Sequence, residues 1–145
     1  MPSRIYLIED QALMRASMQA YLEAEDDLHV VGTAARGEDA LDALLGADLP
    51  DLILIDVSLP GINGIEVLRQ LRAQHPDATC LMLSGHVEEA YVTAANDAGA
   101  RGYVMKGQPD EYLTAIRTIL DGNTYRSDTV AALWDAAAST TGSSA

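Results

Sequence analysis

The chain has 145 residues and a formal net charge of -13 at pH 7. This length suits one domain with a single core and is too short for a receptor joined to a separate effector. The negative charge repels phosphate backbones, so we expect no direct nucleic-acid binding by this domain. No stretch is apolar enough to cross a bilayer, and the first residues lack the pattern of a signal peptide. We therefore expect a cytoplasmic protein that does not enter a membrane.

Cysteine and lysine each occur once in the chain, as Cys80 and Lys106. Cys80 lies within an apolar run, which favours a small buried core residue over a reactive thiol. No disulfide framework or cysteine-based zinc cluster is available. Arginine supplies all the other side-chain cations apart from histidine, so the position of Lys106 becomes informative below.

Five apolar strand-like runs alternate with helical stretches, which is typical of repeated βα units and a parallel sheet. The predicted strands cover residues 5–9, 30–34, 52–55, 79–83 and 102–105. The predicted helices cover residues 11–25, 37–45, 65–74 and 88–98, and a last helix begins at Pro109. The third strand is apolar throughout, as expected of a strand buried on both faces. We predict an α/β fold: a flavodoxin-like (βα)5 doubly wound parallel sheet with strand order 2-1-3-4-5.

The pattern changes after Gly122. A short helix is predicted over residues 127–137, followed by small and polar residues that are typical of a flexible segment. We therefore expect one domain over residues 1–122, and a short helix with a flexible tail or linker over residues 123–145.

Polar or charged side chains follow four of the five predicted strands. They are Glu9 and Asp10 at the end of the first strand, Asp56 after the third, Ser84 after the fourth and Lys106 after the fifth. Because the carboxyl ends of parallel strands meet at one edge of a sheet, these side chains should gather in the crevice where such folds bind ligands. With the first and third strands adjacent, the three carboxylates should lie close together.

Three neighbouring carboxylates repel one another unless a cation joins them, and Mg2+ prefers such oxygen-rich sites. Asp10 and Asp56 would be direct ligands, while Glu9 would orient a bound water. Ser84 and Lys106 supply a hydrogen-bond donor and a positive charge beside Asp56. The chemistry that uses all these parts is phosphoryl transfer to Asp56, in which positioning and charge neutralisation dominate.

Over about residues 4–122 the chain resembles the receiver domains of two-component response regulators. The resemblance rests on the pair Glu9-Asp10, on Asp56 followed by Leu59-Pro60-Gly61 and Gly64, on Ser84-Gly85, and on Lys106 after Gly102-Tyr103-Val104-Met105. It implies that Asp56 is a phosphoacceptor for a histidine kinase or a phosphotransfer protein, with Mg2+ as the cofactor. It also implies a domain that assists its own phosphorylation and dephosphorylation, and that forms a homodimer on phosphorylation.

The resemblance implies further roles around this site. Tyr103 matches an aromatic switch position that turns inward when Ser84 is drawn toward the phosphoryl group, so that the signal reaches the face of the fourth helix, fifth strand and fifth helix. Ser58 and His86 match positions that tune the lifetime of the phosphoryl group, and the backbone carbonyl of Ser58 matches a metal ligand. Gly107 stands where many receivers have proline, and this region is more similar to receivers with a LuxR-type helix-turn-helix output.

Several alternatives stay open at this point. The chain is either a stand-alone receiver or the receiver part of a DNA-binding transcriptional regulator whose helix-turn-helix domain is absent from this sequence. An aspartate-nucleophile phosphatase is disfavoured, because it needs a second acid two residues after the nucleophile, where Ser58 stands. A degenerate interaction module is disfavoured by the complete set of reactive residues. A nucleotide-binding flavodoxin-like protein is disfavoured by the lack of a glycine-rich phosphate loop.

Overall fold

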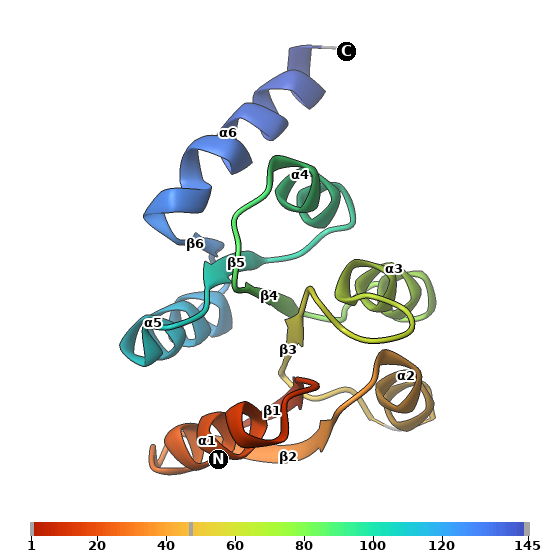
Figure 1. Cartoon of the computed structure of the whole chain (residues 1–145), viewed down its shortest axis with the longest axis vertical. Helices are drawn as coiled ribbons and strands as arrows, with labels where there is room; N and C mark the ends of the chain where they lie inside the picture. Colours follow the sequence, from red (N-terminus) through yellow and green to blue (C-terminus); the bar gives the residue numbers. More distant parts are fainter. Residues whose placement is uncertain (1, 47, 144–145) are drawn as a thin grey trace.

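The computed structural model describes residues 2–46 and 48–143, with side chains as far as residue 135. One parallel sheet runs through the molecule in the order β2-β1-β3-β4-β5-β6 (Figure 1). Its strands are β1 (Ser3–Ile8), β2 (Leu28–Ala34), β3 (Leu52–Asp56), β4 (Cys80–Ser84), β5 (Gly102–Met105) and β6 (Tyr125–Arg126). The first five strands have the predicted flavodoxin-like order, which is confirmed.

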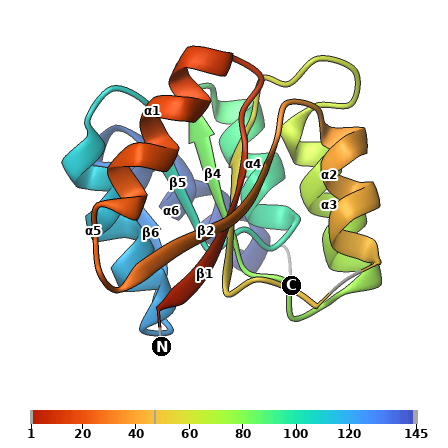
Figure 2. The same cartoon turned by 90° about the horizontal axis from the view of Figure 1, so that it is seen from below.

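Helices cover both faces of the sheet (Figures 1 and 2). They are α1 (Ala12–Glu23), α2 (Gly37–Leu45), α3 (Gly64–Gln74), α4 (Glu89–Asp97), α5 (Pro109–Leu120) and α6 (Asp128–Ser143). Buried side chains of α1 and α5 pack on one face, and those of α2, α3, α4 and α6 pack on the other. This is the doubly wound arrangement, in which each βα connection returns the chain to a parallel strand.

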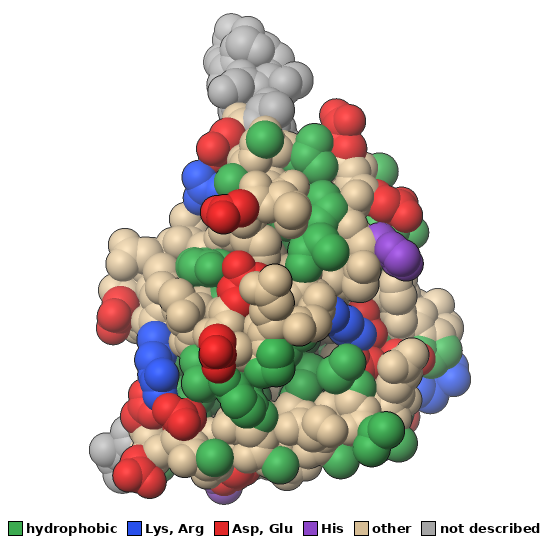
Figure 3. Space-filling model, turned by 60° about the vertical axis from the view of Figure 1, so that its left-hand side comes forward, with side chains coloured by type: hydrophobic (Ala, Val, Ile, Leu, Met, Phe, Trp, Pro, Cys, Tyr) green, Lys and Arg blue, Asp and Glu red, His purple; other side chains and the backbone are tan. Residues whose placement is uncertain are grey.

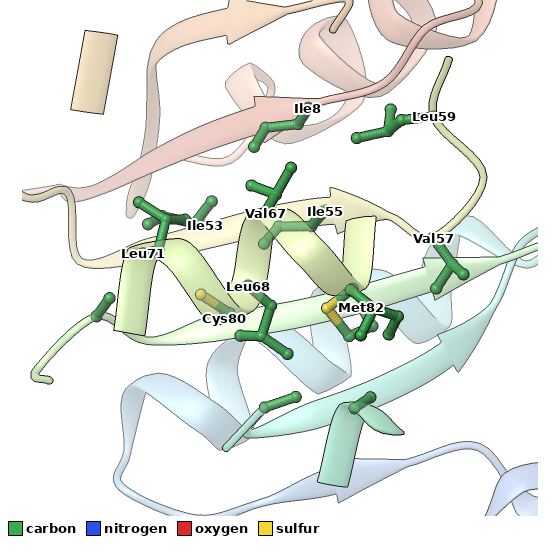
Figure 4. Close-up of a cluster of buried hydrophobic side chains, with 14 of the residues drawn as sticks. Ile8, Ile53, Ile55, Val57, Leu59, Val67, Leu68, Leu71, Cys80 and Met82 are labelled. Atoms are coloured by element: carbon green, nitrogen blue, oxygen red, sulfur yellow. The ribbon is translucent and has the colours of Figure 1, made fainter. Parts of the chain in front are cut away.

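The core is divided by the alternation of side chains along the strands. In β3, Leu52 and Leu54 face α1 and α5, whereas Ile53 and Ile55 face the other helical layer. Figure 4 shows this second layer, where side chains of α3 lie over the sheet. Every residue of β3 is buried. A strand covered on both faces can expose a polar group only where it ends, and β3 ends at Asp56.

The segment after Gly122 differs from the sequence-based expectation. Tyr125–Arg126 forms a sixth strand beside β5, and the following helix extends to Ser143 rather than ending at residue 137. A two-residue strand is too short to show a pattern in the sequence, and the alanine-rich run favours a longer helix. Ser144 and Ala145, the end of the predicted flexible tail, lie outside the described residues. The domain boundary placed after Gly122 stays a prediction.

Figure 3 views the molecule from the side that carries α1 and α5. Hydrophobic side chains gather there among acidic ones, and a hollow between the two helices has apolar walls. Its main lining residues are Met14, Met18, Leu22, Pro109 and Tyr112.

Within the part of the chain that the structure describes, no helix combines the length and the apolar character needed to cross a membrane.

Candidate functional site

Asp56 lies at the carboxyl end of the central strand β3 and is 2% exposed. Its two carboxylate oxygens have different partners. Oδ1 accepts a hydrogen bond from the backbone N–H of Ser58 at 2.9 Å, and Oδ2 lies 2.8 Å from Nζ of Lys106. The turn after β3 and the end of β5 therefore hold this carboxylate in one orientation.

Glu9 follows β1 and is fully buried. Its Oε1 lies 2.5 Å from Nζ of Lys106, and its Oε2 accepts a hydrogen bond from the backbone N–H of Gln11 at 3.2 Å. Gln11 is the residue before α1, where backbone N–H groups have no partner within the helix and attract negative charge. The Glu9 carboxylate is thus held between a helix N-terminus and an ammonium group.

Lys106 follows β5, and its backbone N–H donates to the carbonyl of Ser84 at 2.8 Å. Its side chain is only 15% exposed and bonds both Glu9 and Asp56. Burial lowers the pKa of Lys106, but the hydrogen bonds and the negative charges of Asp56 and Glu9 together outweigh it and raise this pKa above its ordinary value. The side chain is an ammonium at neutral pH, and it offsets part of the negative charge of the two buried carboxylates.

Glu9, Asp10 and Asp56 each offer a carboxylate oxygen, and these oxygens lie within 4.8 Å of one another. The prediction that the acidic pair meets Asp56 at one edge of the sheet is therefore confirmed as geometry. Several carboxylates close together suit a hard divalent ion such as Mg2+, which takes oxygen ligands. The donor set fits Mg2+, while the ligand roles assigned to each residue stay predictions.

Ser84 ends β4 and is 3% exposed. Its hydroxyl donates to the carbonyl of His86 at 2.5 Å and accepts from the backbone N–H of His86 at 3.1 Å. Among the hydrogen bonds of the described residues, none joins Ser84 to Asp56. The side chain of His86 is exposed in this loop. The Ser84 hydroxyl is engaged by its own loop in this state of the molecule.

Tyr103 lies inside β5 and is 0% exposed. Its hydroxyl is buried and has no hydrogen-bond partner among the described residues. Burial raises the pKa of this phenol. The side chain is turned inward and contributes to the core cluster on the α4 side of the sheet. The nearby Ser84 side chain partly lowers the pKa of Tyr103, so the side chains of Ser84 and Tyr103 lie near each other.

Two side chains that hold the site were not identified from the sequence. Arg15 donates through Nη1 to the carbonyls of Glu9 at 2.8 Å and Asp10 at 3.5 Å. Glu38 accepts from the backbone N–H of Ile62 at 3.4 Å, in the loop that follows β3. A cation in the first turns of a helix that follows an acidic pair is a signal that could have found Arg15. The Glu38 contact joins distant parts of the chain and leaves no local pattern.

Comparison with known proteins shows to which family this chain belongs. The model of the response regulator receiver domain matches residues 5–118. Response regulator UvrY of Escherichia coli O6:H1 is 36% identical over 128 residues, which cover 88% of this chain and 58% of UvrY. Transcriptional regulatory protein DegU of Brevibacillus brevis is 35% identical over 123 residues, covering 84% of this chain and 52% of DegU. The chain thus spans little more than half the length of these relatives.

The solved structures agree with this result. The crystal structure of a LuxR-family two-component response regulator from Aurantimonas sp. SI85-9A1 has a TM-score of 0.86 and 31% sequence identity to this chain. The match covers 93% of this chain and 96% of that one, so it includes most of the segment after Gly122. The chain belongs to the family of response regulator receiver domains, and a LuxR-family response regulator is among the solved structures that it resembles.

Proposed function

We propose that this domain is a phosphorylation-dependent switch in which Asp56 accepts a phosphoryl group from a histidine kinase or a phosphotransfer protein. One observation carries the proposal: the buried Asp56 carboxylate lies at a strand end between a single ammonium group and two further carboxylates. Phosphoryl transfer needs a positioned nucleophile and compensation of charge more than it needs an acid or a base. The site offers this combination.

In the proposed step, a carboxylate oxygen of Asp56 attacks phosphorus, the P–N bond to the donor imidazole breaks, and the imidazole leaves with its electron pair. Lys106 and the hydroxyl of Ser84 would bond the phosphoryl oxygens. Glu9, Asp10 and Asp56 would hold Mg2+, with the carbonyl of Ser58 as a further ligand. When bound, Mg2+ neutralises charge on the transferred group.

The domain would assist its own phosphorylation and dephosphorylation without acting as a turnover phosphatase. Position 58, two residues after Asp56, is a serine whose N–H bonds the carboxylate, so no second acid stands there to protonate a leaving group. Ser58 and His86, both exposed, would tune the lifetime of the acyl phosphate. An exposed position beside the site suits this role, because it can order or exclude the attacking water.

We further propose that the signal leaves the site through Ser84 and Tyr103 toward the face of α4, β5 and α5, and that phosphorylation favours a homodimer. The similarity to DegU, a transcriptional regulatory protein, supports a receiver that belongs to a DNA-binding regulator. The chain spans 52% to 58% of the two relatives described, which leaves room for such an output domain in them. We also propose that the protein is located in the cytoplasm.

The test is incubation of the chain with acetyl phosphate and Mg2+, followed by intact-protein mass spectrometry. We expect the mass to increase by one phosphoryl group, and Asp56→Asn to remove the increase because an amide is a poor nucleophile. The matched control is Asp42→Asn, which changes an exposed carboxylate of α2 and should label like the wild type. An unlabelled wild-type chain, or stoichiometric labelling of Asp56→Asn, would overturn the proposal.

A further inference from the structure

The face proposed to carry the signal is already occupied by a segment of the same chain. Strand β6 pairs with β5, and α6 packs against α4 and β5 (Figure 1). Val130 of α6 is 0% exposed and Trp134 is 6% exposed. Both belong to the core cluster that also contains Tyr103. The side-chain amide of Asn96 in α4 adds a hydrogen bond to the carbonyl of Trp134 at 3.5 Å.

A buried serine joins α6 to the strand that leads into the site. Ser127 is 4% exposed, and its hydroxyl accepts from the backbone N–H of Met105 at 3.1 Å and donates to Oε1 of Glu111 at 2.7 Å. Its own N–H donates to the carbonyl of Tyr103 at 3.1 Å. The other oxygen of Glu111 accepts from the hydroxyl of Tyr125 at 3.0 Å. One glutamate of α5 and one serine thus hold β6 and the start of α6 on β5.

The same strand carries the proposed phosphoryl contact. Lys106 directly follows Met105, and its ammonium bonds Asp56 and Glu9. The backbone N–H of Met105, the residue before Lys106, is bonded to Ser127. A movement of Lys106 toward new phosphoryl oxygens would therefore also shift this bonded backbone. The carbonyl of Tyr103 bonds the segment directly, and its buried side chain belongs to the same core cluster as Val130 and Trp134. Strand β5 therefore connects the site to α6.

We infer that α6 is the intramolecular partner of this face, and that its docking is positively coupled to phosphorylation of Asp56. The inference rests on the proposed function. Tyr103 shares one buried cluster with Val130 and Trp134, so an outward Tyr103 would leave a gap in the cluster to which α6 contributes. Docked α6 thus favours the inward Tyr103 that phosphorylation is proposed to favour. Since coupling is reciprocal, phosphorylation must then stabilise docked α6.

The experiment uses the whole chain with Mg2+ and beryllofluoride, a phosphoryl analogue, and reads amide hydrogen exchange by peptide. Formation of the adduct is followed in the same samples by fluorine NMR. We expect exchange in β6 and in the first turns of α6 to slow by about fivefold or more, the usual lower range of such coupling. Unchanged or faster exchange with the adduct formed would overturn the inference and leave the proposed function standing. Failure to form the adduct would remove both.

A pair of variants tests the route through Ser127. Ser127→Ala removes the hydroxyl bonded to Glu111 and Met105, and we expect it to abolish the added protection and weaken beryllofluoride binding about fivefold. Thr129→Ala, an exposed change two residues on, should behave as the wild type. Glu111→Gln is a second variant, which retains the shape of the side chain but has one oxygen acceptor for two hydroxyl groups. Wild-type protection and affinity in both Ser127→Ala and Glu111→Gln would contradict the coupling.

Discussion

At the scale of single residues, Lys106 is what allows two carboxylates to be buried side by side. Glu9 is fully buried and the Asp56 side chain is 3% exposed, and the Lys106 ammonium bonds one oxygen of each. Buried charges are tolerated when they are paired and hydrogen-bonded, and they are costly when one partner is removed. The only lysine in the chain is therefore also an electrostatic support of the fold.

Lys106→Met should accordingly lower the free energy of unfolding in Mg2+-free buffer by about 3 to 5 kcal/mol, the usual cost of breaking a buried pair. Added Mg2+ should restore more stability to this variant than to the wild type, because no ammonium competes for the same oxygens. Urea unfolding with and without Mg2+ measures both effects. The control Arg69→Met removes a cation from an exposed pair with Glu66 and should change stability by less than about 0.5 kcal/mol. Equal losses in the two variants would argue against this role of Lys106.

At the scale of elements, the start of α3 is fitted against the end of β3. The backbone N–H of Gly64 donates to the carbonyl of Val57 at 2.9 Å. A Cβ atom at Gly64 would lie 2.1 Å from the backbone carbonyl oxygen of Asp56, so no larger residue fits without a shift. The turn between β3 and α3 thus depends on a residue without a side chain, and it also sets where the Asp56 backbone lies.

Gly64→Ala should therefore destabilise the domain by about 1 to 3 kcal/mol, as forced overpacking does, and should slow labelling of Asp56 by displacing its backbone. The comparison is Gly85→Ala, because a Cβ atom there would meet nothing within 4 Å. Thermal unfolding and acetyl phosphate labelling of both variants give the result. A stable and normally labelled Gly64→Ala would show that the turn can adapt.

The pairing of β6 predicts a loss of stability in alkaline solution. Burial and the hydrogen bond to Glu111 raise the pKa of Tyr125 to about 12, whereas an unfolded tyrosine titrates near about 10. Because the folded state retains this proton longer, the contribution of Tyr125 is complete below about pH 10 and is lost as the pH rises through about 12. Tyr6, Tyr21 and Tyr103 also have raised pKa values and act in the same direction.

Tyr125→Phe should make this alkaline decline shallower, since the variant has no proton to lose there. Urea unfolding at a series of pH values between about 9 and 12 measures the decline, with Tyr91→Phe at an exposed position of α4 as the control. Identical curves for the wild type and Tyr125→Phe would mean that the phenol is not protected in the folded state.

At the scale of the whole molecule, the segment of residues 123–135 is part of the packed structure. It adds β6 to the edge of the sheet and places Val130 and Trp134 in the core beside α4. Without it, β5 would become an unprotected edge strand and the apolar surface of α4 would be exposed.

A chain shortened to residues 1–122 should lose at least about 3 kcal/mol of stability, in line with removal of a buried tryptophan alone. It should also self-associate more readily through the exposed edge. A chain shortened to residues 1–135 retains β6 and both buried side chains, and it is the control. Urea unfolding and light scattering compare them. Equal stability of the two shortened chains would show that this segment only rests on the surface.

Much of the site was predictable because its signals are local. Each polar residue lies at the end of an apolar strand, so the sequence alone assigns Glu9, Asp10, Asp56, Ser84 and Lys106 to one edge of a parallel sheet. Most helix boundaries followed from the same alternation of apolar and polar runs, whereas the strand order was predicted from the flavodoxin-like fold class. Periodicity and the position of a residue at a strand end are patterns among residues that are close together in the chain, so they can be recognised in the sequence.

Other features were decided only by the tertiary structure. The bonds of Arg15 to the Glu9 loop, of Glu38 to Ile62, and of Glu111 to Ser127 depend on which segments meet after folding. So does the burial of Trp134, on a helix whose alanine-rich sequence shows no marked apolar face. A sequence by itself determines which residues favour a strand, a turn or a charged strand end. Which distant groups finally pair is determined by packing, because burial removes water as an alternative partner and so makes each polar contact obligatory.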